Sequence, residues 1–289
     1  MFDSEKNKVE KSTLYLVGTP IGNLADMSNR ALKVLSEVDF VAAEDTRNGG
    51  RLLSYFGISK PLVSYYEHNK RERGEEIIQR LLAGESCALI TDAGMPAISD
   101  PGEDLVRLCA ERGVSVTTIP GACAMITALT LSALSTSKFV FEGFLPVQKK
   151  ERRQRLDLLC AESRTFILYE APHKLRTTLS DLCEALGEDR KVAICRELTK
   201  INEEIQRVTL RQACEIYSTR EPRGEYVLVI DGADESTVKK EKSLPSKDHL
   251  KAEVDKLCKE GMSKNSAIKS VALSNGMTRN QLYDMLVEK

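Results

Sequence analysis

The sequence predicts an α/β protein that ends in a small helical domain. Short apolar runs of the kind that form buried strands alternate with amphipathic stretches typical of helices. Several of the apolar runs end in loops rich in glycine, proline and aspartate. Residues 239–289 instead carry three short helical patterns, with 11 Lys or Arg against 7 Asp or Glu. Together these observations predict two α/β domains followed by a basic helical appendage.

Composition supports this fold class and excludes others. With 289 residues, 42% of them hydrophobic and 29% charged, the chain is long enough for two globular domains. No apolar run approaches the roughly 18 residues of a membrane span, so no membrane partner is expected. Eight cysteines without a CxxC pair indicate reduced thiols and a cytoplasmic location. Three histidines far apart in sequence predict no metal site.

The domain boundaries follow shifts in polarity along the chain. The first dozen residues are polar and mixed in charge, and a second polar stretch separates the last strand from the terminal helices. The predicted parts are a disordered tail (1–12), an N-terminal α/β domain (13–138), a second α/β domain (139–231), a linker (232–246) and a basic three-helix domain (247–289).

Apolar and β-branched runs bounded by turn residues predict the strands. In the first domain we expect them at 13–18, 40–43, 62–66, 88–90 and 114–119. In the second we expect them at 139–144, 165–169, 191–196, 204–209 and 226–230.

Amphipathic stretches between these runs predict the helices. The first two domains should hold helices around 31–35 and at 75–83, 101–111, 125–134, 149–161, 174–186 and 211–218. The C-terminal helices are expected at 248–259, 263–273 and 279–289, with Ser263 and Thr278 as N-caps.

The first predicted strand runs into a sharp turn. Gly18 and Gly22 bracket Thr19-Pro20-Ile21, as in a nucleotide-binding turn, although the GxGxxG spacing is absent. Glu44 closes the second strand 22 residues after Gly22, near where a dinucleotide site keeps its ribose-binding acid. A dinucleotide site therefore remains an alternative at this point.

The loop after the fourth strand is the most strongly shaped in the chain. Residues 91–102 hold two glycines, two prolines and two aspartates before a helix begins. Open α/β sheets bind ligands beyond the carboxyl ends of their strands, so we expect this loop to form the floor of a site. Asp92 is suited to accept hydrogen bonds from a ligand or to fold onto its own turn. Asp100 is an N-cap or a functional carboxylate.

Charged groups gather after the second and third strands. Glu44, Asp45 and Arg47 follow the second strand, and His68 and Asn69 follow the third. These groups are placed to face a substrate, or they form internal ion pairs, with His68 incidental.

Small or polar residues at further strand ends add candidates. Ala122 and Cys123 open a helix, where small side chains let a ligand approach backbone N–H groups or let helices pack closely. Tyr169 and Glu225 flank strands of the second domain. A helix bearing Lys149, Arg152 and Arg153 faces phosphate or forms a solvated surface.

The C-terminal helices have the pattern of a helix-turn-helix unit. Ala267, Ile268, Val271 and Ala272 are spaced to face the apolar residues of the last helix. The charge is +4 over 239–289 and −5 over the rest, which favours an anionic partner such as nucleic acid. Protein contact is the alternative.

Seven motifs resemble, in type, order and spacing, those of the tetrapyrrole methylase family, in the branch that modifies small-subunit ribosomal RNA. They cover about residues 13–231 and read GTPIGNLADMSNRAL, AAEDTR, TDAGMPAISDPG, PGACA, FEGFLP, LYEAPHKL and RGEYVLVI. The resemblance implies two α/β domains with S-adenosylmethionine in the cleft between them, and a homodimer.

By motif position, the resemblance implies cofactor contacts in the three N-terminal loops and at two strand ends of the second domain. These are Pro20, Ile21, Gly22, Asp92, Gly94, Met95, Ile98, Ser99, Ala122, Cys123, Tyr169 and Glu225. The chain departs from the family where Cys123 replaces a common serine, Met95 a common threonine and Tyr66 a frequent histidine.

The branch implies methylation of the ribose 2′-hydroxyl of a decoding-site cytidine, with ribosomal RNA or the small ribosomal subunit as partner. The candidates for the general base are Glu44, Asp45, His68 and Asp100. Substrate contacts are expected at Arg47, Asn69, Lys149, Arg152 and Arg153. A methyltransferase for a small macrocycle and a non-catalytic nucleotide- or RNA-binding module are the alternatives. The basic tail disfavours the macrocycle, which needs no domain for an anionic partner.

Overall fold

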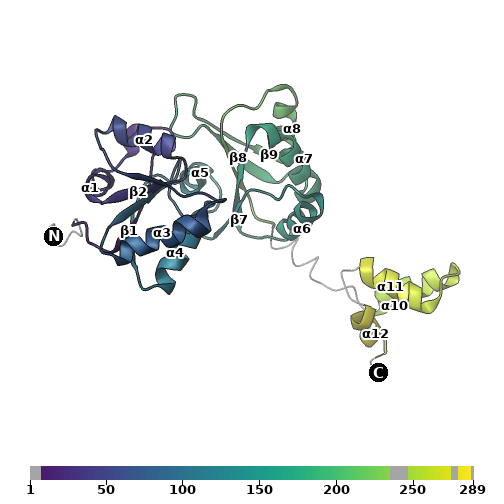
Figure 1. The fold of residues 1–289 in the computed structure, drawn as a ribbon. Coiled ribbons are helices and arrows are strands. Elements are labelled where there is room, and N and C mark those ends of the chain that lie inside the picture. Colours follow the sequence, from purple (N-terminus) through teal and green to yellow (C-terminus); the bar gives the residue numbers. More distant parts are fainter. Residues whose placement is uncertain (1–7, 235–246, 275–278, 288–289) are drawn as a thin grey trace. The chain divides into compact units, whose positions relative to one another are not determined.

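A computed structural model describes residues 8–234, 247–274 and 279–287 (Figure 1). The chain divides into two compact parts. Met1–Gly232 contains both α/β sheets, and Ala233–Lys289 contains the C-terminal helices. The predicted fold class is confirmed.

The first sheet is parallel throughout, with strand order β3-β2-β4-β1-β5. Its strands are β1 Thr13–Val17, β2 Phe40–Ala43, β3 Leu62–Ser64, β4 Cys87–Ile90 and β5 Ser115–Ile119. The central strands β2 and β4 are buried at every position, as expected of a parallel sheet covered on both faces. Because the strands are parallel, all five carboxyl ends lie along one edge of the sheet.

Helices cover both faces of this sheet. One face packs against α1 Asn29–Glu37 and α2 Thr46–Tyr55, whose apolar side chains meet those of alternate strand residues such as Val17 and Val41. The other face packs against α3 Lys70–Leu82 and α4 Gly102–Glu111.

Helix α3 begins at residue 70, before the predicted 75, and β3 ends at Ser64, before the predicted 66. The Asn69 amide explains both ends, because its Oδ1 accepts from the Tyr66 N–H at 2.8 Å and its Nδ2 donates to the Ser64 carbonyl at 3.1 Å. The first turn of α3 consists of charged residues, so the sequence has no apolar periodicity there from which the start of the helix could be predicted.

The second sheet is mixed, with strand order β6-β7-β10-β8-β9. Its strands are β6 Phe139–Gly143, β7 Thr165–Glu170, β8 Lys191–Arg196, β9 Glu204–Thr209 and β10 Tyr226–Ile230. Only β6 and β7 pair in parallel. One face packs against α6 Lys149–Cys160, α7 Leu175–Leu186 and α8 Leu210–Thr219.

The other face of the second sheet packs against α5 Ala124–Leu131. Ala128 and Leu129 of this helix share a buried cluster with Ile167, Ala193 and Val229 of the second sheet. In Figure 1, α5 lies between the two sheets. The helix precedes the predicted boundary at 138, yet it packs on the second sheet, and both sheets belong to one compact part of the chain.

Contacts begin before β1. Of the tail predicted over residues 1–12, residues 1–7 lie outside the described residues, whereas Val9 packs on the first core. Lys11 pairs with Asp39 at 3.3 Å, and the Ser12 N–H donates to the Glu85 carbonyl. Residues 8–12 are therefore anchored to the first domain.

The C-terminal part has a core of its own. Its helices are α10 Lys247–Lys259, α11 Lys264–Ser274 and α12 Arg279–Val287. As the sequence predicted, Ala267, Ile268, Val271 and Ala272 share a buried cluster with Leu282, alongside Leu250 and Val254, and Met285 and Leu286 pack against it. Ser263 caps α11 by accepting from the Ser266 N–H at 3.3 Å. The other predicted cap, Thr278, and most of the predicted linker lie outside the described residues.

Within the part of the chain that the structure describes, no helix is long and apolar enough to cross a membrane. Those residues also contain no group of three His, Cys, Asp or Glu side chains placed to hold a metal ion. All eight cysteines are free thiols.

Candidate active site

Three loops at the carboxyl edge of the first sheet are joined through their backbones. Thr19, after β1, and Gly94, after β4, exchange two hydrogen bonds, with N–H to O distances of 2.9 and 3.1 Å. Gly94 has φ of 88°, which strongly favours glycine.

A third loop, after β5, meets the first at a pair of glycines. A Cβ on Gly121 would lie 2.9 Å from the Gly18 Cα, and one on Gly18 would lie 2.8 Å from the Gly121 Cα. Glycine is therefore required at both positions, and main chain forms the floor of the predicted site.

Asp100 organises the loop between β4 and α4. Its carboxylate accepts from the N–H groups of Ala97 at 3.0 Å, Ile98 at 3.3 Å and Gly102 at 2.7 Å. Ala97 and Ser99, on either side of Ile98, adopt left-handed backbone with φ of 68° and 63°. Such conformations cost about 1–3 kcal/mol per residue, so the three hydrogen bonds hold a strained loop in place.

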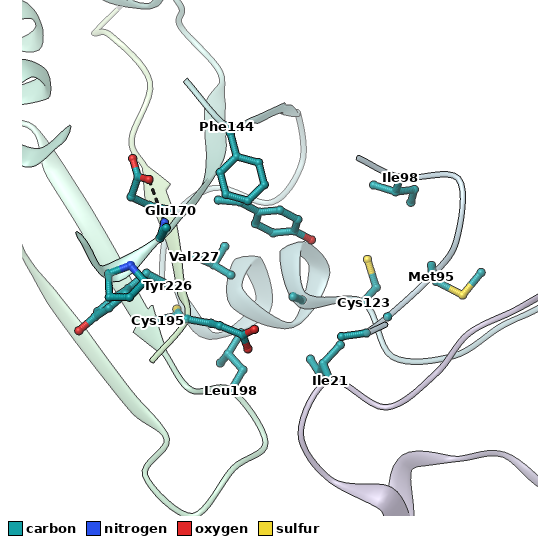
Figure 2. A pocket seen from close by; sticks show the side chains of 17 residues that line it. Ile21, Met95, Ile98, Cys123, Phe144, Glu170, Cys195, Leu198, Tyr226 and Val227 are labelled. Carbon is teal, nitrogen blue, oxygen red and sulfur yellow. Dashed lines mark hydrogen bonds between the residues drawn. The ribbon is translucent and has the colours of Figure 1, made fainter. Parts of the chain in front are cut away.

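A cavity of about 350 Å³ opens above these loops, which is a suitable size for a small molecule. Ile21, Met95 and Ile98 form one side, and residues of the second sheet form the opposite side (Figure 2). The full lining is Ile21, Ala93, Gly94, Met95, Ile98, Cys123, Ala124, Phe144, Tyr169, Glu170, Ala171, Pro172, Cys195, Leu198, Glu225, Tyr226 and Val227. We call it the interdomain cavity.

Two aromatic rings form part of the wall of the interdomain cavity. The Phe144 and Tyr169 rings meet edge to face with their centroids 5.8 Å apart. Burial raises the pKa of Tyr169 to about 12, so its hydroxyl stays protonated at neutral pH. The wall therefore offers aromatic faces and one neutral hydroxyl.

Glu170 contributes a buried carboxylate, with only 5% of the residue exposed. It accepts hydrogen bonds from the Ala171 N–H at 2.8 Å and from the Thr178 hydroxyl. Thr178 in turn accepts from Arg152 Nη2 at 2.8 Å. Among the described residues Glu170 has no ion-pair partner, and the lining of the interdomain cavity contains no Lys, Arg or His. A cationic ligand would complement it.

Seven of the twelve predicted cofactor residues line the interdomain cavity, namely Ile21, Gly94, Met95, Ile98, Cys123, Tyr169 and Glu225. Ala122 lies directly beneath it, since its carbonyl oxygen would be 3.5 Å from a Cβ on Gly94. Ser99 is placed at the junction with the second domain, where its Oγ would lie 3.4 Å from a Cβ on Gly143.

Pro20, Gly22 and Asp92 instead line a neighbouring cavity of about 430 Å³ over the first sheet alone. We call it the edge cavity, and it is lined by Thr19, Pro20, Gly22, Leu24, Asn48, Gly49, Arg51, Leu52, Tyr55, Ile90, Thr91 and Asp92. Asp92 accepts from Asn48 Nδ2 at 3.0 Å. The segments 19–22 and 91–95 each contribute some residues to one cavity and some to the other, so the two cavities adjoin.

The four predicted general-base candidates all lie outside the interdomain cavity lining. Asp45 caps α2, and hydrogen bonds from the Arg47 side chain lower the pKa of Asp45 to about 2. Asp45 and Arg47 thus pair with each other, Arg47 Nη2 lying 2.6 Å from Asp45 Oδ2. Asp100 is occupied by the three N–H groups described above.

Glu44 and His68 have fewer partners. Glu44 is half-buried at the end of β2, where Oε2 accepts from the Thr91 hydroxyl at 2.9 Å beside the edge cavity. His68 is exposed, and its ring lies edge to face with Tyr66 at 6.1 Å. Glu44 therefore lies close to the edge cavity. Within the described residues, His68 makes no hydrogen bond, ion pair or ring contact with Glu44, Asp45 or Asp100, the other candidates for the general base.

Among the predicted substrate contacts, Asn69 folds back onto its own turn, and Arg47 is exposed beside Asp45. Lys149, Arg152 and Arg153 line a separate cavity between α6 and α7. Arg152 is engaged internally, because its Nε donates to Asp181 at 2.6 Å in addition to the Thr178 bond. These contacts indicate a structural role for Asn69 and Arg152.

Several lining residues were missed by the sequence analysis, including Phe144, Cys195, Leu198 and Val227. The motif FEGFLP contains Phe144, but a single apolar residue after a strand does not distinguish a cavity wall from core. Leu198 lies in the connection between β8 and β9, where nothing in the residue types marks a site.

Comparison with known proteins adds a family. The profile described as Tetrapyrrole (Corrin/Porphyrin) Methylases matches residues 13–214, which run from β1 into α8 and include every strand of the two sheets except β10. The chain belongs to this family.

Relatives within the family match over nearly the whole chain. A protein named "Ribosomal RNA small subunit methyltransferase I" from Synechocystis is 45% identical over 95% of this chain and 97% of its own length. Proteins of the same name from Halalkalibacterium halodurans and Bacillus subtilis are 45% and 42% identical, over 98% and 97% of this chain and 97% and 96% of their own lengths. These matches include the C-terminal helices.

Solved structures share the family fold at low identity. Cobalt precorrin-4 methyltransferase has a TM-score of 0.58 and 18% identity, over 76% of this chain and 95% of its own. Uroporphyrin-III C-methyl transferase from Thermus thermophilus, complexed with S-adenyl homocysteine, has a TM-score of 0.56 and 15% identity, over 76% and 97%. At these identities the likeness concerns the fold alone.

Proposed function

We propose that this protein transfers the methyl group of S-adenosylmethionine to small-subunit ribosomal RNA. The support is the name shared by relatives that are 42–45% identical over at least 95% of the chain. We further propose that the acceptor is the ribose 2′-oxygen of a cytidine in the decoding region. The sequence motifs support this finer assignment by resemblance, and the same resemblance supports a cytoplasmic homodimer.

The interdomain cavity fits the methyl donor. S-Adenosylmethionine carries sulfonium and ammonium charges against one carboxylate, so it is cationic overall. The buried Glu170 carboxylate and the aromatic rings of Phe144 and Tyr169 suit a cation, since ring faces attract positive charge. The apolar side chains of Ile21 and Leu198 suit the remaining surface of such a ligand. When bound, the cofactor would supply an activated methyl group.

The chain's own contribution is alignment and proton removal. In-line displacement requires the acceptor oxygen to approach the methyl group from the side opposite the leaving sulfur, so positioning supplies much of the rate. The edge cavity adjoins the interdomain cavity through residues 19–22 and 91–95, and we assign the acceptor nucleotide to it.

Of the four candidates, we assign the general base to Glu44. It stands at the edge cavity, and only one of its two carboxylate oxygens is engaged within the described residues. Asp45 and Asp100 are held by their hydrogen bonds, and we assign positioning roles to them. We place His68 and Arg47 on the exposed rim, where they would contact RNA.

Methylation of a small macrocycle is the second candidate, because related folds include uroporphyrin-III and precorrin methyltransferases. The C-terminal helices disfavour it, and we propose that these helices bind RNA.

Deleting residues 239–289 should leave cofactor affinity unchanged and weaken RNA binding, and the remaining RNA affinity should depend less on salt concentration. Unchanged RNA affinity would assign the helices to protein contact or folding.

The decisive test follows a tritiated methyl group. The full chain would be incubated with labelled S-adenosylmethionine and one of two acceptors. The first is small ribosomal subunits from a bacterial strain that lacks its own small-subunit methyltransferase I, so that the target nucleotide is unmethylated. The second is uroporphyrinogen. Nuclease digestion should place the label on the ribose of one cytidine. Label on a base would overturn the acceptor assignment, and label only in the macrocycle would overturn the RNA function.

A further inference from the structure

A cavity of about 640 Å³ lies between α6 and α7 of the second domain. We call it the helix cavity. Its lining is Leu145, Val147, Lys149, Arg152, Arg153, Leu156, Asp157, His173, Lys174, Thr177, Thr178, Asp181, Glu184 and Ala185. None of these residues lines the interdomain cavity.

Neighbouring residues of two chain segments line the interdomain cavity and the helix cavity respectively. Phe144 lines the interdomain cavity and Leu145 the helix cavity, in the segment between β6 and α6. Likewise Pro172 lines the first and His173 the second, just before α7. The two cavities therefore lie on either side of the same two chain segments, before α6 and before α7.

Three cations stand at this mouth. Lys149 and Arg153 lie in the first turns of α6, and Lys174 immediately precedes α7. None of the three makes an ion pair with any residue that the structure describes. The acidic lining residues Asp157, Asp181 and Glu184 lie beyond the first turns of their helices, with Asp157 one turn after Arg153 and Asp181 paired with Arg152. The positive ends of two twelve-residue helix dipoles reinforce the charge at the mouth.

Arg152 has a different part in the same cavity. Its side chain is only 15% exposed, and it bonds both Asp181 and Thr178 on α7. It fixes α6 against α7, which leaves Lys149 and Arg153 on either side of it free of internal partners. Arg152 therefore ties α6 to α7 within the cavity, while Lys149 and Arg153 are exposed.

We propose that the mouth of the helix cavity binds backbone phosphates of the RNA substrate through Lys149, Arg153 and Lys174, apart from the cavities assigned to the cofactor and the acceptor nucleotide. This proposal rests on the proposed RNA methyl transfer and adds a second RNA contact besides the C-terminal helices. The chemistry is that of sequence-independent backbone binding, in which cations fix the register of the strand and the selection of the nucleotide occurs elsewhere.

The test compares two triple variants of the full chain. Lys149→Ala/Arg153→Ala/Lys174→Ala removes the mouth cations. Arg71→Ala/Lys138→Ala/Lys150→Ala removes three exposed cations that line none of the three cavities, and Lys150 shares α6 with the mouth. The two variants carry the same net charge, so a difference between them reports position and not overall charge.

Binding of small-subunit ribosomal RNA would be measured across a salt series, together with calorimetry for S-adenosylmethionine. For the mouth variant we expect affinity about tenfold lower at 0.1 M salt, and a slope of log K against log salt reduced by about 2. Its KM for RNA should rise while kcat and cofactor affinity stay at the levels of the unmodified chain.

Equal RNA affinity and equal salt slope in the two triple variants would overturn the proposal. Failure of the underlying function would look different, because the unmodified chain would then transfer no methyl group to RNA. If the unmodified chain methylates RNA and both variants match it, the phosphate site alone is refuted.

Discussion

The hydroxyl of Thr178 donates a hydrogen bond to the buried carboxylate of Glu170 at the wall of the interdomain cavity. A hydroxyl has one proton to donate, so its oxygen is left to accept from Arg152, at 2.8 Å. Glu170 lines one cavity, and Arg152 and Thr178 line the other. A single threonine therefore connects the proposed cofactor site with the proposed phosphate site.

Thr178→Val should disturb both sites at once. The substitution keeps the shape of the side chain but leaves Glu170 and Arg152 each short of a buried partner, at a cost of about 1–3 kcal/mol. We expect a lower melting temperature, weaker cofactor binding by calorimetry and a higher KM for RNA. Thr177→Val is the matched control, since Thr177 is exposed in the same cavity and its hydroxyl makes no hydrogen bond with the described residues. Equal effects of the two variants would contradict a role for the connection.

Glu170→Gln tests the charge of the interdomain cavity. The substitution removes the negative charge, and the single amide oxygen can accept only one of the two hydrogen bonds that Ala171 and Thr178 donate to the carboxylate, so affinity for S-adenosylmethionine should fall about tenfold. Glu225→Gln is the comparison, because Glu225 lines the same cavity but is exposed and pairs with Lys200 at 2.9 Å. We expect it to change affinity less than threefold, about 0.7 kcal/mol. A cofactor affinity unaffected by Glu170→Gln would exclude the charge argument.

Asp100→Ala should release the loop between β4 and α4. Without its carboxylate, Ala97 and Ser99 have no compensation for their left-handed conformations and the loop should relax. We expect cofactor affinity to fall at least tenfold while unfolding stays cooperative, measured by calorimetry and by thermal melting. The control is Glu103→Ala on the adjacent turn, where the side chain is exposed and pairs only with Arg107 among the described residues. Normal cofactor binding by Asp100→Ala would show that the loop is rigid without it.

Glu204 should make the second domain sensitive to acid. Hydrogen bonds from Arg220 lower the pKa of Glu204 to about 2, against about 4.3 in an unfolded chain. A carboxyl whose pKa is lowered by folding stabilises the protein above the unfolded pKa, and this stability is lost as pH falls from about 4.3 toward 2. Glu204→Gln should therefore flatten the dependence of unfolding free energy on pH in this window. If both proteins show the same profile between pH 5 and 2, other carboxyls govern acid unfolding.

Much of the fold was predictable because buried strands leave a direct signal. The runs that became β2 and β8 through β10 were placed at their observed bounds, since alternating or continuous apolar residues end at polar turns. The packing of α5 was not predictable. Its sequence AMITALTL is apolar on most sides, which indicates burial but does not say which sheet buries it.

The candidate site was predictable where it depends on backbone shape and not where it depends on packing. Gly94 and Ile21 carried loop signals and line the interdomain cavity. Asp92 was assigned to the same group, yet it lines the edge cavity, because neighbouring residues of one loop project to different sides. Phe144 and Leu198 were missed, since their place in a cavity wall depends on contacts between distant segments.

The glycine contact between Gly18 and Gly121 and the bonds between Thr19 and Gly94 give the fold an unusual freedom to diverge. A floor built from main chain needs glycine at a few points and little else, so the side chains that rise from it can be exchanged without rebuilding it. Methyltransferases with only 15% and 18% identity to this chain share its architecture. Met95 and Cys123 line the interdomain cavity at positions where the family motif commonly has other residues, and they are examples of such an exchange of side chains.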